Sequence, residues 1–190
     1  PKYAAAENNL AVCLMIQGRL AEAEACCRRA LAHAPGQAEI LVNLGVVLKN
    51  ARRQSEAEAC YREALRLRPD YAEAAFNLGI AQQEMGCLAE AEASYRLAIS
   101  LRPNYADALC NLGGLLRDRE IYGEAERILR SAIAVNPRHA GAHCNLGVVL
   151  RELGQLTASA AAYRQALAID PAFSDAFSNL LFGYNYGSFH

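Results

Sequence analysis

Asparagine recurs along this chain at an interval of 34 residues, and its side chain both donates and accepts hydrogen bonds. The six members of this series are Asn9, Asn43, Asn77, Asn111, Asn145 and Asn179. An amide can pair with a peptide group whatever side chain that group carries, so a row of amides suits the backbone of an extended peptide. The alternative is that each asparagine bonds the neighbouring structural unit and fixes how the units stack. Both roles are compatible with the sequence.

Charged residues accompany this asparagine series. Four acidic residues precede an asparagine of the series by four positions: Glu39, Glu73, Asp107 and Asp175. That spacing places the carboxylate and the amide on one face of a helix. It predicts a preference for ligands with basic or hydroxyl groups, with solvated surface charge as the alternative. Three basic residues flank the same face and are candidates for contacting acidic ligand groups: Lys49, Arg117 and Arg151, with Gln83 at the matching place.

Catalytic and metal chemistry find little support in the sequence. No nucleophile–base–acid set and no phosphate-binding loop is recognisable. His139 and His143 lie four residues apart beside Cys144, but zinc takes four ligands, or three with a water. The pair also straddles a predicted boundary after Pro137. We therefore predict that the chain is not itself an enzyme and binds neither a metal nor a cofactor.

The chain has seven cysteines and no C-x-x-C pair. This usage is typical of small buried side chains in a reducing compartment, which predicts a cytoplasmic location. Cys110 and Cys144 occupy equivalent places beside the asparagine series, and a redox role for them is the alternative.

Charge and hydropathy exclude several classes of partner. The formal net charge is -1, without the basic excess that nucleic-acid binding requires. No apolar run approaches the ~20 residues of a membrane-spanning helix. The chain begins at Pro1 rather than at a methionine, so we expect it to be a piece of a longer protein.

The elements that position the asparagines are predicted by further series with the same interval. Prolines recur at Pro35, Pro69, Pro103, Pro137 and Pro171. Small residues recur at Gly45, Gly79, Gly113 and Gly147, and at Ala30, Ala64, Ala98, Ala132 and Ala166. Proline ends a helix because it lacks an N–H and disfavours helix at the preceding residue. Glycine and alanine permit the close approach of two crossing helices.

The turn between the two helices of each repeat carries a further signal. Gly18, Gly86 and Gly154 follow the first helix of their repeats, which suits a left-handed C-terminal cap. Arg52 and Glu120 stand at the equivalent positions. We therefore expect the turns at Arg52 and Glu120 to differ from the other three.

The combined pattern of Asn-Leu-Gly, Ala, Tyr, Ala-Leu and Pro resembles the tetratricopeptide repeat family. The resemblance implies an all-α, right-handed α-solenoid that forms a single domain over residues 1–190. Its five helix-turn-helix repeats span residues 4–37, 38–71, 72–105, 106–139 and 140–173, and a capping helix covers about 174–186. By the geometry of the family, the first helix of each repeat lines a concave groove. The asparagine series and its charged neighbours then line this groove, where proteins or peptides bind in extended conformation.

Two short segments narrow the resemblance. Together with the asparagine series, Tyr105-Ala106-Asp107-Ala108 and Phe173-Ser174-Asp175-Ala176 are similar to the superhelix of O-linked N-acetylglucosamine transferases. The residues from Asp175 to Phe182 resemble the segment where that family, including its bacterial homologues, leaves the repeats for the glycosyltransferase domain. This implies the substrate-recognition region of such an enzyme, and a free-standing adaptor or scaffold is the alternative. The aromatic residues near the end predict possible self-association, as a homodimer or end to end: Phe182, Tyr184, Tyr186 and Phe189.

Overall fold

The structure is a computed structural model that describes the backbone of residues 2–186 and the side chains of residues 3–180. This described part contains eleven helices and no strand, so the prediction of an all-α fold is confirmed. The four aromatic residues behind the self-association prediction, Phe182, Tyr184, Tyr186 and Phe189, lie outside the described side chains.

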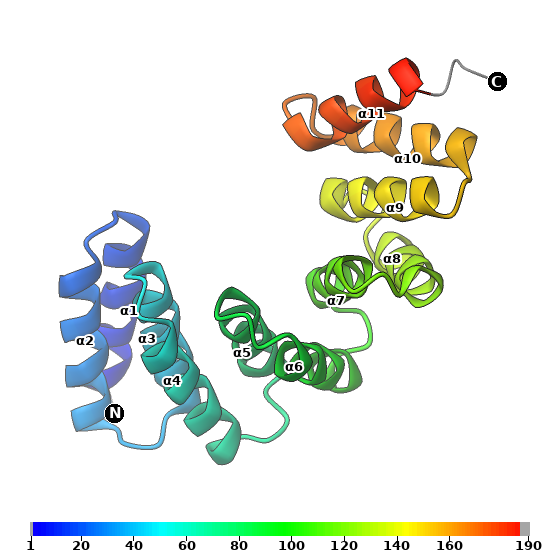
Figure 1. The fold of residues 1–190 in the computed structure, drawn as a ribbon. Helices are drawn as coiled ribbons and strands as arrows, with labels where there is room; N and C mark the ends of the chain where they lie inside the picture. Colours follow the sequence, from blue (N-terminus) through cyan, green and yellow to red (C-terminus); the bar gives the residue numbers. More distant parts are fainter. Residues whose placement is uncertain (1, 187–190) are drawn as a thin grey trace. The chain divides into compact units, whose positions relative to one another are not determined.

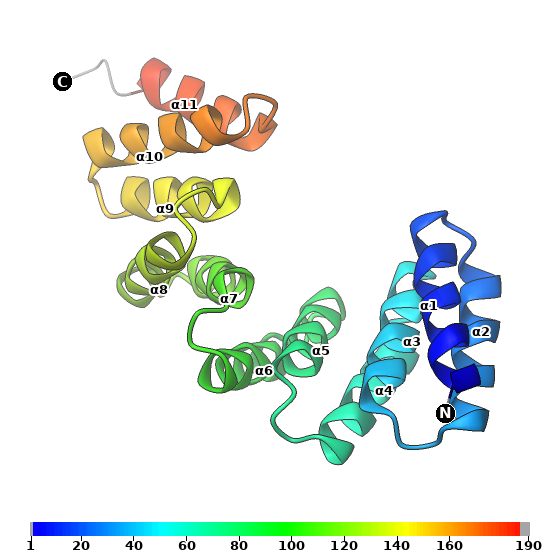
Figure 2. The same ribbon diagram turned by 180° about the vertical axis from the view of Figure 1, so that it is seen from behind.

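The chain divides into two compact units, Pro1–Arg102 and Pro103–His190. The first unit holds α1 (Lys2–Ile16), α2 (Leu20–His33), α3 (Ala38–Asn50), α4 (Gln54–Leu67), α5 (Ala72–Glu84) and α6 (Leu88–Leu101). The second holds α7 (Ala106–Asp118), α8 (Tyr122–Val135), α9 (Ala140–Glu152), α10 (Leu156–Ile169) and α11 (Ser174–Tyr186). Within each unit, consecutive helices fold back on one another as hairpins joined by short turns (Figures 1 and 2). The odd-numbered helices, which carry the asparagine series, are called first helices below.

A glycine in the first helix packs against a large side chain of the following helix. The three pairs with tyrosine are Gly45–Tyr61, Gly79–Tyr95 and Gly147–Tyr163. A Cβ atom at Gly45 or Gly147 would lie only 2.5 Å from the tyrosine ring. These tyrosines are buried, so the ring cannot simply move into solvent. The prediction that the glycines permit close helix crossing is therefore confirmed.

Two repeats fill the same crossing with smaller side chains. Gly113 packs against Leu129, whose Cγ would lie 2.5 Å from an added Cβ. In the first hairpin Ala11 takes the place of the glycine, and Cys27 takes the place of the tyrosine. Both are buried, at 1% and 0% exposure. The small thiol of Cys27 leaves the room that the methyl group of Ala11 occupies.

The turns that follow the first helices share one conformation, so the expectation that two of them differ was wrong. Arg52 has φ 62° and Glu120 has φ 60°, in the same left-handed region as Gly18, Gly86 and Gly154. The residue after each also makes the same bond, as when the N–H of Arg53 donates to the carbonyl of Leu48 at 2.9 Å. This closure requires a left-handed residue whatever its side chain. A non-glycine residue there costs about 1–2 kcal/mol, which the packing of the repeats offsets.

Candidate functional site

The described residues of the second unit enclose a pocket of about 290 Å³ where α7, α9 and α11 come together. Its lining residues are Arg117, Gly141, Cys144, Asn145, Val148, Phe173, Asp175, Ser178 and Asn179. Four of them were predicted to belong to the site: Arg117, Asn145, Asp175 and Asn179. Since these four come from three first helices and lie up to 62 positions apart in the chain, it is the helix packing that brings them together.

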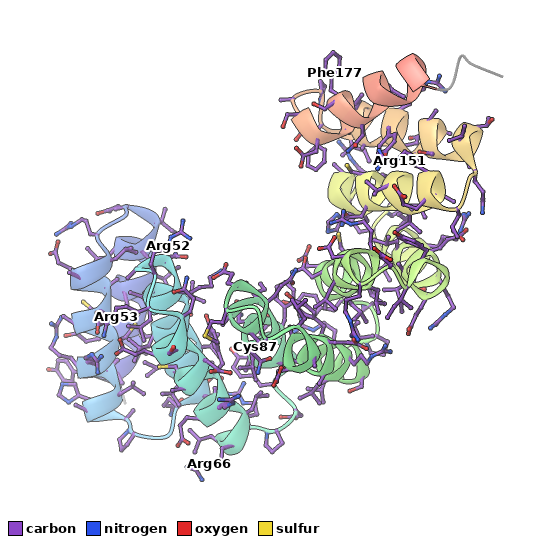
Figure 3. The ribbon with its side chains drawn as sticks, in the orientation of Figure 1. Arg52, Arg53, Arg66, Cys87, Arg151 and Phe177 are labelled. Carbon is purple, nitrogen blue, oxygen red and sulfur yellow. The ribbon has the colours of Figure 1, made fainter. Side chains whose placement is uncertain are left out.

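Arginines hold the amides of this pocket from the preceding first helix. Nη1 of Arg117 donates to Oδ1 of Asn145 at 2.5 Å, and Nη1 of Arg151 donates to Oδ1 of Asn179 at 3.2 Å. Figure 3 labels Arg151 on α9. A guanidinium group has donors only, so each amide must turn its oxygen to the arginine. The Nδ2 groups therefore point elsewhere, and that of Asn145 lies 3.6 Å from Sγ of Cys110, a weak acceptor.

The guanidinium groups are themselves neutralised locally. Nη2 of Arg117 lies 2.6 Å from Oδ1 of Asp118, and Nη2 of Arg151 lies 2.9 Å from Oε1 of Glu152. These ion pairs fix the arginine side chains along their own helices. Each arginine is then a positioned hydrogen-bond donor for the next repeat rather than a free positive charge.

The asparagines of the first unit are held in a different way. Nδ2 of Asn43 donates to Oδ1 of Asn8 at 2.9 Å, which links α3 to α1. Nδ2 of Asn77 donates to the backbone carbonyl of Glu73 in its own helix at 2.8 Å. Both amides thus use their nitrogen internally. Asn9 is exposed.

Inter-repeat bonding by the asparagine series is therefore present in the structure. Asn43, Asn145 and Asn179 each bond a residue of the preceding repeat. Asn111 is half-buried. At three of the six positions, then, the asparagine bonds the neighbouring repeat, as the alternative prediction described. Hydrogen-bonding groups of these amides that have no partner can still bind a ligand.

Two of the predicted acidic residues are paired with arginines. Glu39 forms an ion pair with Arg68, and Glu73 lies 3.5 Å from Arg102. Arg68 and Arg102 are the residues that follow the last turns of α4 and α6. The hydrogen bond from Arg68 holds the pKa of Glu39 below its usual range. These carboxylates are largely committed to the fold of the first unit.

The acidic residues of the second unit differ from each other. Oδ1 of Asp107 lies 3.2 Å from Nε2 of His139. Nδ1 of His139 accepts from the N–H of Ala142 and so caps α9, which leaves the ring proton for Nε2 when the ring is neutral. Asp175 is exposed and forms no ion pair with a described side chain. Asp175 is therefore the carboxylate most available to a ligand.

Equivalent positions of four repeats hold residues that make different contacts: Lys49, Gln83, Arg117 and Arg151. Gln83 does not reach along the row, because its Oε1 accepts from the hydroxyl of Tyr95 at 2.7 Å. Lys49 lies half-buried in the last turn of α3. The structure thus brings Arg117 to the pocket and Arg151 to its amide Asn179.

Sequence reasoning missed several residues of the site. Phe173 lines the pocket and was not assigned to the site, although Tyr71 and Tyr105 stand at the equivalent positions; Ser178 also lines it and does not recur at the 34-residue interval. Asn8, the partner of Asn43, was overlooked because its neighbour Asn9 is the member of the series. Arg68 and Arg102 could have been found, since both stand directly before a proline and 29 residues after an acidic residue of the series.

The cysteines beside the asparagine series are not activated. Burial raises the pKa of Cys110 and of Cys144 to about 11. Because the thiolate is the reactive form, these thiols stay protonated and inert near neutral pH. Cys13 and Cys87 are exposed, so burial does not account for all seven cysteines.

The described residues form neither a metal site nor a membrane-spanning helix. No group of three or more histidine, cysteine, aspartate or glutamate residues is placed to hold a metal ion there. None of the helices in that part combines the length and the apolar character that crossing a membrane demands.

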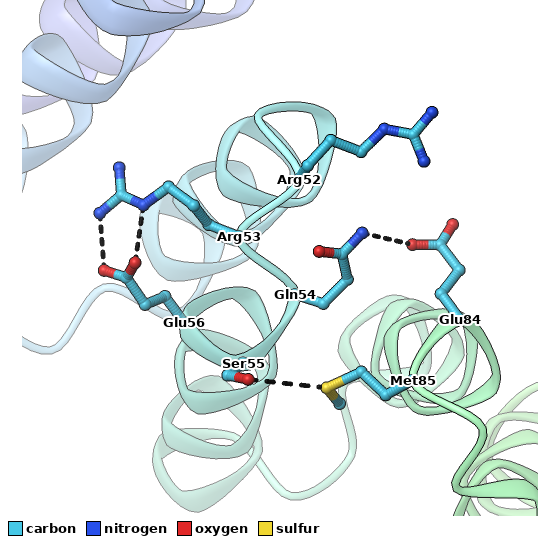
Figure 4. Close-up of a pocket in the computed structure, with 7 residues that line it drawn as sticks. All are labelled: Arg52, Arg53, Gln54, Ser55, Glu56, Glu84 and Met85. Atoms are coloured by element: carbon cyan, nitrogen blue, oxygen red, sulfur yellow. Dashed lines mark hydrogen bonds and ion pairs between the residues drawn. The ribbon is translucent and has the colours of Figure 1, made fainter.

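A second pocket, of about 480 Å³, lies in the first unit between the α3–α4 turn and the end of α5 (Figure 4). Its polar side chains bond one another: Arg53 with Glu56, Gln54 with Glu84, and Ser55 with Met85. Two of these contacts join α4 to the end of α5. We interpret this pocket as a junction between repeats, since most of its polar groups are already paired.

Comparison with known proteins agrees with the helical repeats just described. Three family profiles, each described as tetratricopeptide repeat, match residues 2–70, 60–93 and 110–172. The hairpins, the 34-residue interval and these matches define a helical-repeat protein. The chain belongs to the tetratricopeptide repeat family. No curated protein sequence matches the chain.

Solved structures show the same fold. MamA from Desulfovibrio magneticus RS-1 is 18% identical with a TM-score of 0.77, over 91% of this chain and 98% of that one. YrrB, described as a TPR protein with an unusual peptide-binding site, is 22% identical with a TM-score of 0.71, over 90% and 89%. A chain of the APC/C hetero-tetramer Cut9–Hcn1 is 16% identical with a TM-score of 0.86, over 99% of this chain and 38% of that one.

Proposed function

We propose that this chain is a protein-interaction module that binds extended peptide segments along its first helices. The observation that supports it is the pocket of the second unit, where Arg117, Asn145, Asp175 and Asn179 converge. Ligand sites combine an apolar lining with a few placed polar groups, and Val148 and Phe173 supply the apolar part here. YrrB, whose fold is similar, is itself described as having a peptide-binding site.

The role proposed is binding rather than catalysis. Tetratricopeptide repeats generally act without catalytic groups, and the pocket offers amides and an arginine whose charge is locally paired. Such groups recognise a polypeptide backbone but do not form a nucleophile with its base. We propose no cofactor for this site.

The test uses peptides selected from a random display library on the whole chain. Asn145→Asp with Asn179→Asp keeps the size of each side chain and the contact to the arginine, but it removes the Nδ2 donors. We expect the selected peptides to bind this variant at least about tenfold more weakly. Asn104→Asp makes the same chemical change in the turn before α7, outside the pocket, and serves as the control. Equal binding to the wild type and to the double variant would place the peptide elsewhere and refute the proposed site.

We also propose the narrower role of substrate recognition for an O-linked N-acetylglucosamine transferase-like enzyme. This proposal is supported only by the asparagine series and by the segments around Asp107 and Asp175. Reading the parent gene beyond His190 tests it, because the role requires a glycosyltransferase domain there. A gene that encodes no such domain would leave the adaptor or scaffold role.

Self-association is a second candidate, and α1 gives it a specific observation. Tyr3, Leu10 and Ile16 of this helix are 79%, 48% and 78% exposed, whereas Leu44, which matches Leu10 one repeat later, is 4% exposed. Exposed apolar side chains of this kind favour association with a second copy. Light scattering of the wild type and of a Leu10→Lys, Ile16→Lys variant tests it. A monomer in both cases would contradict self-association through α1.

A further inference from the structure

We propose that the pocket of the second unit takes a proline-containing segment in polyproline II conformation with a basic residue beside the prolines. This inference rests on the proposed function, because it names the ligand class for the same pocket. Three features carry it: the orientation of the two amides, the spacing of adjacent first helices, and the residues that line the pocket.

The orientation of the amides determines which backbone groups they can read. Asn145 and Asn179 give Oδ1 to Arg117 and Arg151, so the groups left for a ligand are N–H donors. One N–H of Asn145 is directed at Sγ of Cys110, a weak acceptor, and its second N–H stays available. An N–H donor binds a carbonyl oxygen of the ligand and does not require the ligand to supply an N–H. Proline lacks that N–H but keeps its carbonyl, so it can accept a hydrogen bond from these amides as well as any other residue does.

The spacing of the two amides favours polyproline II over an extended strand. They sit at equivalent positions on α9 and α11, and adjacent packed helices are about 10 Å apart. A polyproline II helix has three residues per turn and rises about 9 Å per turn, so carbonyls three residues apart face the same side. In a β-strand successive carbonyls point to opposite sides, so carbonyls three residues apart also face opposite sides. Only the first conformation offers two carbonyls to both amides at once.

The remaining lining groups fit the side chains of such a segment. Val148 and Phe173 are half-buried and line the same pocket as the polar groups, so they are available to contact proline rings. Asp175 is exposed and has no ion pair with a described side chain, whereas Arg117 is already paired with Asp118. The unbalanced charge of the pocket is therefore negative, which favours a lysine or an arginine on the ligand.

The experiment uses four fluorescent peptides of about twelve residues with the whole chain, and fluorescence anisotropy measures their affinities. The proline peptide carries several prolines and one arginine, and the strand peptide replaces the prolines with threonine and valine. The alanine peptide replaces them with alanine, and the acidic peptide replaces the arginine with glutamate. We expect the proline peptide to bind about tenfold more tightly than the strand peptide, with the alanine peptide between them.

Variants connect this preference to the named groups. Asn145→Asp with Asn179→Asp should weaken binding of the proline peptide at least about tenfold despite the two added negative charges, because each carboxylate repels the ligand carbonyl that Nδ2 would hold. Asn77→Asp in the first unit should leave the binding unchanged. Asp175→Asn should remove the preference for the proline peptide over the acidic peptide, which we expect to be about threefold to tenfold at physiological salt. Thermal unfolding of each variant checks that the fold is retained.

The outcomes separate the two proposals. A strand peptide that binds as tightly as the proline peptide, and that is still weakened by Asn145→Asp with Asn179→Asp, overturns this inference and keeps the proposed site. Failure of all four peptides and of every library-selected peptide to bind overturns both. The comparison of proline and strand peptides on the unaltered chain needs no variant, so poor folding of a variant cannot hide the result.

Discussion

The two compact units carry the same asparagine series but orient its amides in opposite ways. In the first unit Asn77 donates from Nδ2 to its own helix and leaves its oxygen free. In the second unit Asn145 and Asn179 accept from arginines through Oδ1, so that their oxygens are engaged and N–H groups remain, although one N–H of Asn145 is directed at the weak acceptor Sγ of Cys110. A series that is uniform in sequence can therefore present acceptors in one region and donors in another.

One position of the repeat, 28 residues before the next asparagine, differs between the units: Lys49 stands there before Asn77, whereas arginines stand there before Asn145 and Asn179. Gln83, which stands there before Asn111, turns instead to the hydroxyl of Tyr95. Arg117 and Arg151, at the equivalent place, are longer and reach the amide of the next repeat. One repeat position thus serves packing in the first unit and the candidate site in the second.

The largest predicted difference between the units concerns the glycine at the helix crossing. Gly45→Ala in the first unit forces a methyl group against the buried ring of Tyr61, and we expect a net loss of about 2 kcal/mol. Gly113→Ala in the second unit brings the methyl group equally close to the buried Leu129, but an aliphatic side chain yields more readily than a tyrosine ring, so we expect a smaller net loss, of about 1 kcal/mol. Urea denaturation measures both.

Gly123→Ala is the control for this pair, because nothing lies within 4 Å of an added Cβ on α8. It should raise the free energy of unfolding by about 0.5 kcal/mol through helix propensity alone, at the low end of the range because Gly123 is the second residue of α8. Equal losses for Gly45→Ala and Gly113→Ala would show that the two crossings are equally rigid.

The tyrosine contact that occupies Gln83 gives a second test. Tyr95→Phe removes the bond to Gln83 and should cost about 1 kcal/mol. The hydroxyl of Tyr61 is buried without a partner among the described residues, so Tyr61→Phe should stabilise the chain by about 1 kcal/mol. Opposite signs in chemical denaturation are expected, and a loss for Tyr61→Phe would mean that its hydroxyl is hydrogen-bonded.

The shared left-handed turns predict equal effects in the two units. Arg52→Gly and Glu120→Gly should each raise the free energy of unfolding by about 0.5–1 kcal/mol. The reason is that glycine adopts the left-handed conformation without the steric cost that a side chain brings. Gly86→Ala makes the reverse change and should lower it by a similar amount. Thermal unfolding measures all three variants, and destabilisation by Arg52→Gly or by Glu120→Gly would contradict the common turn conformation.

The smallest predicted effect is pH-dependent and belongs to the first unit. Arg68 lowers the pKa of Glu39 in the folded chain, so this pair stabilises the fold above the unfolded pKa of glutamate, about 4.3. Its contribution is lost as the pH falls from there through the folded pKa. Both side chains are partly exposed, so Glu39→Gln should cost under about 1 kcal/mol at pH 7 and nothing near pH 2. A loss of equal size at both pH values would rule the ion pair out as its source.

The sequence predicted the elements better than the site, for physical reasons. The helices, their hairpins and the small residue at each crossing follow from local periodicity, as Gly147 against Tyr163 illustrates. The turns at Arg52 and Glu120 were mispredicted because the repeat geometry, not the side chain, determines φ there. The orientation of Asn145 depends on Arg117, 28 positions earlier on another helix, and periodicity carries no information about such a contact.

The most direct test of the opposite amide orientations is a titration of the side-chain amide resonances by NMR. With the chain labelled with ¹⁵N, the proline peptide is added and the asparagine NH₂ signals are followed. We predict that the signals of Asn145 and Asn179 shift on binding while the signal of Asn77 stays in place, because only the first two line the pocket of the second unit. A shift confined to Asn77 and Asn43, with Asn145 and Asn179 unchanged, would contradict the proposed donor site in the second unit.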